Sequence, residues 1–200
     1  MTELFMKNIA NKLNNDYSKM FNILDKYLKD KVEDIDNTIL SAFEYRKNGK
    51  IFTFKEHLRG FIYAQLSALV SWKKIKRNLA NIDNIFCRFD KEKLKLKSSE
   101  DLIAEITEIK CNNPYTTKNQ MRSLKVNIET FKRIEKDFSG IEKFITCHSP
   151  INAIKLLADS NSTYKLKYSG VALVCEYLRN MGIDIIKPDV HLKRILATDI

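Results

Sequence analysis

Turn-forming residues are scarce in this sequence, whose 200 residues include only five glycines and three prolines. A β-sandwich or a β-barrel with many hairpins needs more of both, so these fold classes are disfavoured. No stretch shows the sustained polar–apolar alternation of a strand. Leu, Ile, Lys and Glu are abundant and favour helices, and the apolar fraction of 44% can build a core in a chain of this length. The sequence therefore predicts an all-α fold.

Metal-binding patterns are also missing. The four cysteines, Cys87, Cys111, Cys147 and Cys175, are spaced too widely for a zinc or iron–sulfur clip. Three histidines in all exclude most His-rich metal sites. No apolar run approaches the roughly 18 residues of a membrane span, and we recognise no signal peptide. We expect a cytoplasmic protein with reduced cysteines, without an iron–sulfur cluster and without membrane contact.

Positive charge is in excess, with 35 Lys and Arg against 25 Asp and Glu, a net charge of +10 and a pI of about 9.3. A balance this basic favours polyanionic partners, of which nucleic acid is the commonest. Both halves of the chain carry the excess. Solubility or an A+T-rich genome also explains such a composition, so charge alone does not identify the partner.

Apolar side chains recur at helical spacing along most of the chain. Residues 1–50 are predicted to form N-terminal helices, and residues 51–200 a helical domain whose lobes share one core. Within these parts the pattern predicts helices over the first ~45 residues, over 52–79 as the longest stretch, from Ser98 or Ser99 to before Asn112, and over 118–135, 151–158, 171–181 and 190–197. The charged segment 90–97 is predicted to be a loop.

The C-terminal quarter is predicted to fold as helix, turn and helix, followed by a carboxylate at the start of a further helix. Ser149 and Pro150 open the first of these helices, and Gly170 lies in the turn. Pro188 keeps the residue before it extended, so that Asp189 caps the last helix. A turn that leads into a helix points several backbone amides outward, and these can hold a DNA phosphate without reading the base sequence.

These residues carry a resemblance to a known family. The segment 166–178, followed by Lys187-Pro-Asp-Val-His191 and Arg194, is similar to the signature of the helix-hairpin-helix superfamily of base-excision DNA glycosylases. The positions that match are Leu166, Gly170, Asp189, His191 and Arg194. A weaker similarity lies upstream, where Ala64-Gln-Leu-Ser67 resembles the family's Gln-containing helix.

The resemblance implies a two-lobed helical domain with a helix-hairpin-helix motif and a central cleft, into which a nucleotide is flipped from the duplex. It implies that Asp189 is the catalytic carboxylate, which stabilises the cationic sugar as the base departs or orients water onto it. The DNA-binding residues that it implies are Gln65, Lys167, Ser169, Gly170, Val171, His191 and Arg194. Among these, the backbone of residues 169–171 would hold phosphate, and Gln65 would probe the duplex where the base has left.

Several departures from the family pattern qualify these expectations. Tyr168 stands where the first glycine of the hairpin belongs, and because a tyrosine adopts positive φ only at a cost, we expect this turn to differ from the usual one. Ala172 or Leu173 occupies the place of the nucleophilic lysine of bifunctional members, so we expect no Schiff-base chemistry. The C-terminal four-cysteine cluster of some relatives is missing. A monovalent cation bound at the hairpin is the one cofactor that the resemblance allows.

Other interpretations remain open. The chain could be a non-catalytic helix-hairpin-helix module in which Asp189 is only a helix cap, or a helical protein–protein interaction domain. Gln65 is either a buried hydrogen-bonding residue or the duplex probe. Cys147 and His148 could form a nucleophile–base pair, but adjacent residues rarely face each other.

Double-stranded DNA is the partner that we expect, bound by a monomer in the cytoplasm and, in a bacterium, at the nucleoid. The basic residues that flank the turn are Lys165, Lys167, Lys193 and Arg194. Their charges would favour binding to phosphates with a steep dependence on salt.

Overall fold

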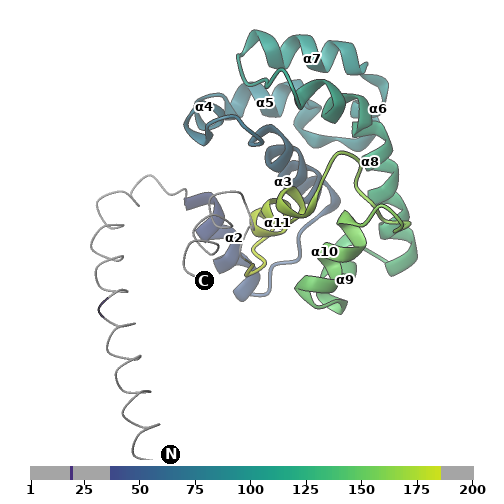
Figure 1. Cartoon of the computed structure of the whole chain (residues 1–200). Helices are drawn as coiled ribbons and strands as arrows, with labels where there is room; N and C mark the ends of the chain where they lie inside the picture. Colours follow the sequence, from purple (N-terminus) through teal and green to yellow (C-terminus); the bar gives the residue numbers. More distant parts are fainter. Residues whose placement is uncertain (1–18, 20–36, 186–200) are drawn as a thin grey trace, which may run out of the picture. The chain divides into compact units, whose positions relative to one another are not determined.

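The structure is a computed structural model that describes residue 19 and residues 37–185 (Figure 1). Its elements in chain order are α2 (Asn37–Lys47), α3 (Phe54–Leu66), α4 (Trp72–Arg77), α5 (Leu79–Ile85), the 3-10 helix η1 (Cys87–Phe89), α6 (Lys91–Leu96), α7 (Ser99–Glu108), α8 (Thr117–Phe138), α9 (Ile141–Cys147), α10 (Pro150–Ala158) and α11 (Val171–Asn180). No strand occurs among the described residues. The predicted all-α fold is therefore confirmed.

The spatial contacts between residues divide the chain into two compact units, with the boundary between Thr38 and Ile39. Nearly all described residues belong to the second unit, in which the buried apolar side chains form one continuous core. This division lies before the boundary that we predicted at residue 50. The difference comes from α2, because Ala42 is buried and belongs to the same core.

Helix α3 is the centre of this unit and packs against α8, α11 and η1. A capping box starts it: the Thr53 side chain accepts the amide N–H of Glu56, and the Glu56 carboxylate accepts the amide N–H of Thr53 at 2.7 Å. Phe61 of α3, Phe131 of α8 and Tyr177 of α11 then meet edge to face, with ring centroids 5.4–5.9 Å apart. Each such aromatic pair adds about 1 kcal/mol to the free energy of unfolding beyond burial.

Two local predictions were wrong. The predicted helix over 52–79 ends at Leu66, because Leu69 takes a left-handed conformation with φ +63° and a new helix starts only at Trp72. The charged segment 90–97 contains helix α6 rather than a loop. Its first turn is capped by the Asp90 carboxylate, which accepts the amide N–H groups of Glu92 and Lys93.

Helix α8 is the longest described element, with 22 residues, and packs against α3, α6, α7 and α9. It covers the predicted segment 118–135 and extends it by one residue at the start and three at the end. Figure 1 shows it running from the α6–α7 end of the unit toward α9 and α10. Polar residues interrupt its buried face, and one of them, Asn127, is completely buried. This residue positions the candidate site.

Candidate nucleic-acid interface at the α10–α11 turn

Of the three helices predicted in the C-terminal quarter, the first two are present and pack against each other, and the third, 190–197, lies outside the described residues. Helix α10 begins as the sequence predicts, with Pro150 at its first position and the Ser149 hydroxyl accepting the amide N–H of Asn152 at 3.3 Å. Helix α11 begins at Val171 with Gly170 as its N-cap residue. Residues 159–170 form the turn between them.

Side chains of α8 hold this turn in place. Asn127 accepts the amide N–H of Lys167 at 2.7 Å and donates to the carbonyl oxygen of the same residue at 3.1 Å. Nearer the start of the turn, Arg133 donates to the carbonyl oxygen of Thr163 at 2.9 Å. The hydroxyl of Tyr164 donates to the Asp137 carboxylate at 3.0 Å. These contacts fix an exposed segment against the core.

Tyr168 adopts φ +55°, in the left-handed region. The cost of positive φ for a tyrosine was our reason to expect a turn that differs from the usual hairpin, and Tyr168 adopts positive φ despite that cost. A non-glycine residue in this region costs about 1–2 kcal/mol. The surrounding contacts offset the cost: Asn127 holds the preceding residue, and the fully buried Leu166 donates its amide N–H to the carbonyl oxygen of Leu157 at 3.0 Å.

Lys165 has a structural position that the sequence did not indicate. Its ammonium donates to the carbonyl oxygens of Ala158, at the end of α10, and of Ser169, just before α11, both at 2.6 Å. Partial burial lowers the pKa of this ammonium from its usual value. Lys165 therefore connects the two ends of the turn. We had predicted that its charge would face a phosphate, and this prediction was wrong.

The orientation of two peptide groups follows from these contacts. The described peptide bonds are trans, so the C=O and N–H of one peptide group point in opposite directions. The Lys167 carbonyl faces Asn127, so the N–H of Tyr168 points away from α8. The Ser169 carbonyl faces the Lys165 ammonium, so the N–H of Gly170 points away from Lys165.

The N–H groups of Tyr168, Gly170 and Val171, which we call the amide cradle, have no hydrogen-bond acceptor within the described ranges. Gly170 is exposed, and the side chains of Tyr168 and Val171 are about half exposed. Unpaired backbone donors beside the positive end of a helix are groups that bind anions. Ser169 does not contribute its amide as predicted, because that N–H donates to the carbonyl oxygen of Leu166 at 3.2 Å and the residue is buried.

Gln65 is completely buried near the end of α3. Its backbone carbonyl accepts the side-chain amide of Gln120 at 3.0 Å, while its own side-chain amide has no partner among the described residues. Of the two interpretations left open by the sequence, a buried hydrogen-bonding residue or the duplex probe, the structure shows the burial but no hydrogen bond of the side-chain amide among the described residues. A side chain without exposed surface does not reach a duplex in this conformation.

The remaining predicted site residues are Asp189, His191 and Arg194, and all three lie outside the described residues, as does Lys193. Of the predicted DNA-binding residues, the structure brings Lys167, Gly170 and Val171 together on the exposed side of the turn. Gln65 lies on another element and in the core.

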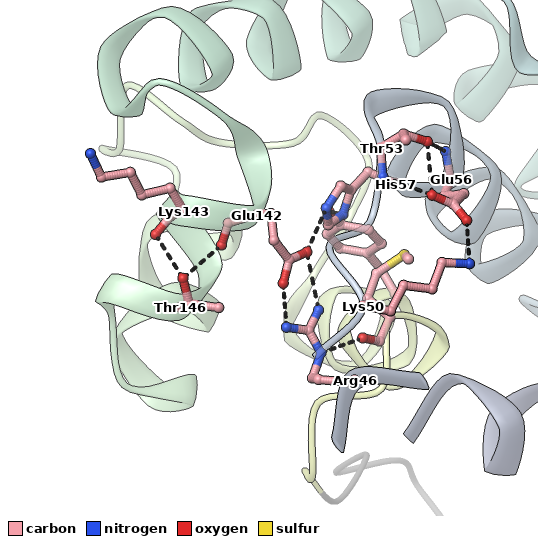
Figure 2. A network of polar contacts seen from close by, with 10 residues as sticks. Arg46, Lys50, Thr53, Glu56, His57, Glu142, Lys143 and Thr146 are labelled. Carbon is pink, nitrogen blue, oxygen red and sulfur yellow. Dashed lines mark hydrogen bonds and ion pairs between the residues drawn. The ribbon is translucent and has the colours of Figure 1, made fainter. Parts of the chain in front are cut away.

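A chain of polar side chains, not indicated by the sequence, connects α2, α3, α9 and α11 (Figure 2). Arg46 forms an ion pair with Glu142 through its two terminal guanidinium nitrogens, and its Nε donates to the carbonyl oxygen of Met181 at 2.8 Å. Glu142 is 3.0 Å from Nε2 of His57, and Nδ1 of His57 is 2.9 Å from the Tyr177 hydroxyl. No local pattern could have revealed the contact between His57 and Glu142, since they are 85 positions apart.

The protonation states of these linked side chains follow from the charges of Arg46 and Glu142 and from burial. Hydrogen bonds from His57 and Arg46 outweigh partial burial and lower the pKa of Glu142, so its carboxylate accepts the Nε2–H of His57. Burial lowers the pKa of His57, and the neutral ring then accepts the Tyr177 hydroxyl proton at Nδ1. His57 and Tyr177 are both inaccessible to solvent. We therefore interpret this chain as a connection between helices and not as a reactive site.

Cys147 and His148 do approach each other, with the sulfur 3.3 Å from Nδ1. The same Nδ1 lies 2.7 Å from the carbonyl oxygen of Phe144, which can only accept a hydrogen bond. Nδ1 therefore carries a proton and cannot take one from the thiol. This geometry does not support a nucleophile–base pair. In the described part of the chain, no group of three or more His, Cys, Asp and Glu side chains could hold a metal ion.

Comparison of the chain with protein-family models, with curated proteins and with solved structures finds no match in any of the three. Within residues 37–185, no helix is both long and apolar enough to cross a membrane.

Proposed function

We propose that this chain is a monofunctional DNA N-glycosylase that holds the DNA backbone with the amide cradle and uses Asp189 as its catalytic carboxylate. The observation that supports the binding step is the cradle itself: outward-facing amides at the start of α11, on a turn held by Asn127 and Lys165. Backbone donors at a helix N-terminus bind phosphate without reading sequence. An enzyme that inspects many sites along DNA needs this kind of contact.

The chemical step of the proposal rests on the sequence. With the target nucleotide flipped into a cleft between helical lobes, the N-glycosidic bond breaks and its electron pair leaves with the base. Asp189 offsets the positive charge that develops on the sugar, and water adds to the sugar while a proton neutralises the base. Ala172 or Leu173 takes the place of the nucleophilic lysine of bifunctional members, and neither has a side-chain amine. The proposal therefore includes no covalent enzyme–DNA intermediate.

A non-catalytic module that only holds DNA is the second candidate. The burial of Gln65 favours it, because this residue does not reach the space that a flipped nucleotide would leave. Such a module needs the cradle but no catalytic carboxylate.

A panel of labelled duplexes, each with a different damaged or mispaired base, distinguishes the two candidates. Base release leaves an abasic site that alkali converts to a strand break. We expect the parent protein to release at least one base, and Asp189→Asn to be slower by at least ~10²-fold with its affinity for DNA retained. Binding without release from any duplex leaves the non-catalytic module. Base release by Asp189→Asn at the parent rate contradicts the catalytic assignment.

A further inference from the structure

The Lys165 ammonium lies between two carbonyl oxygens that belong to the two ends of the α10–α11 turn. Ala158 is the last residue of α10, so its carbonyl is one of those that a helix end leaves without an internal partner. Carbonyl oxygens at a helix C-terminus attract cations. The contacts of 2.6 Å are short for N–H···O hydrogen bonds, as charge-assisted bonds are.

We propose that the Lys165 ammonium is a built-in cation of the turn and replaces the monovalent ion that carbonyl oxygens in such a place would otherwise bind. The two oxygens are already occupied by a positive charge, and a second cation beside it would be repelled. The monovalent ion allowed by the resemblance therefore does not fit between these carbonyls. The proposal rests on the proposed function only for its effect on phosphate binding.

A tethered ammonium has an advantage over a free ion. It loses no translational freedom when it enters the site, because the side chain already holds it there. It is also present at any concentration of Na⁺ or K⁺. The turn of this protein should therefore form equally well in salts whose cations cannot fit between carbonyl oxygens.

The ammonium acts on the amide cradle through one peptide group. By holding the carbonyl of Ser169, it directs the N–H of Gly170 outward. Without it, the carbonyls of Ala158 and Ser169 both lose their partner, and the peptide group between Ser169 and Gly170 is free to rotate. Lys165 is thus a positioning residue for phosphate binding and does not itself contact the phosphate.

The test uses the full chain and two matched variants, Lys165→Met and Lys167→Met. Both remove one positive charge from the same turn and keep a linear side chain, but Lys167 is exposed and its ammonium contacts no acceptor among residues 37–185. Thermal unfolding and affinity for an undamaged duplex are measured in sodium, potassium and tetramethylammonium chloride at equal ionic strength. Tetramethylammonium is too large to lie between two carbonyl oxygens and has no N–H to donate.

We expect the parent protein to have the same Tm and the same Kd in all three salts. In tetramethylammonium, Lys165→Met should lose about 5 °C in Tm and bind DNA at least ~10-fold more weakly. In sodium or potassium chloride, this variant should recover part of its Tm and part of its DNA affinity, because the carbonyl oxygens of Ala158 and Ser169 then bind the free cation. Lys167→Met should bind DNA more weakly, and the slope of log affinity against log salt concentration should fall by about one unit. Both changes should be the same in the three salts.

Three results overturn the proposal: a parent protein whose Tm depends on the identity of the cation, a Lys165→Met variant equal to the parent, or a variant weakened equally in all three salts. If Lys165→Met does not fold, the comparison of the parent protein in the three salts still decides. The Tm measurement needs no DNA. A parent that binds no duplex in any salt therefore contradicts the proposed function and leaves the test of the cation intact.

Discussion

The buried side chain of Asn127 forms hydrogen bonds with both backbone groups of Lys167, 40 positions further along the chain. One side-chain amide thereby fixes the residue that precedes the left-handed Tyr168 and orients a peptide group of the amide cradle. The stability of the core and the shape of the exposed turn are coupled through this pair. Changes in α8 should therefore affect both unfolding and DNA binding.

Replacing Asn127 by Ala tests this coupling. The substitution leaves the N–H and C=O of Lys167 without their partners, and we expect the free energy of unfolding to fall by about 2–3 kcal/mol. Urea unfolding gives this value, and fluorescence titration with a duplex should show weaker binding. Asn119→Ala, in an exposed part of α8, serves as the control and should change neither quantity appreciably. A stable Asn127→Ala protein that binds DNA normally contradicts the role of this residue.

Replacing Tyr168 by Gly should stabilise the protein. Glycine takes positive φ without the steric cost that tyrosine bears, so we expect a gain of about 1 kcal/mol in the free energy of unfolding. Tyr115→Gly is the matched control, because Tyr115 is 82% exposed but has no positive φ. That variant should gain nothing. A loss of stability in Tyr168→Gly would mean that contacts of the tyrosine ring outweigh the backbone strain.

Gly182 and Gly49 together separate backbone strain from packing. Both have positive φ, +71° and +80°. A Cβ at Gly182 would lie 2.4 Å from the carbonyl oxygen of Ala42, whereas nothing lies within 4 Å of one at Gly49. Gly49→Ala should cost about 1 kcal/mol from strain alone. Gly182→Ala should cost about 2 kcal/mol more, because α2 must shift away from the end of α11. If the two variants lose the same free energy of unfolding in urea, α2 shifts away from the added Cβ at little cost, and the contact with Ala42 is not the main effect.

The stability of the protein should depend on pH through His57. Burial lowers the pKa of His57 in the folded state below its unfolded value of about 6.5. Above that value both states carry a neutral ring. As the pH falls below it, the unfolded state takes up a proton first, so the free energy of unfolding decreases, by at most about 1.4 kcal/mol per pH unit.

Urea unfolding between about pH 7.5 and 5.5 measures this slope. Glu142 contributes only at lower pH, since burial and its partners leave its folded pKa below the ordinary carboxyl value. In His57→Gln the slope should be smaller, because the amide can replace both hydrogen bonds without titrating. His148→Gln controls for the loss of one histidine. Parent and His57→Gln proteins with identical slopes would contradict the sign worked out for His57.

Local signals in the sequence determined much of the helical architecture. Ser149 and Pro150 start α10 where the sequence predicts, because a helix cap involves residues within one turn of each other. The amphipathic spacing of α8 likewise reveals its buried face. Local signals failed where the backbone turns left-handed at Leu69, because nothing in that residue type favours positive φ.

The candidate site depended on tertiary structure. The sequence indicated that a turn before α11 could offer amides to phosphate, that positive φ would be costly at Tyr168, and that Lys165 would face the ligand. In the structure, Asn127 holds the residue before Tyr168, which does adopt positive φ, and the carbonyl oxygens of Ala158 and Ser169 hold the Lys165 ammonium. A residue adopts the left-handed conformation when contacts hold its neighbours on both sides. A lysine side chain turns inward when carbonyl oxygens without other partners can accept its hydrogen bonds. Asn127 comes from α8, 40 positions away, whereas the carbonyl oxygens of Ala158 and Ser169 lie within seven positions of Lys165. The folded turn and its packing against α8 together decide which amides are free.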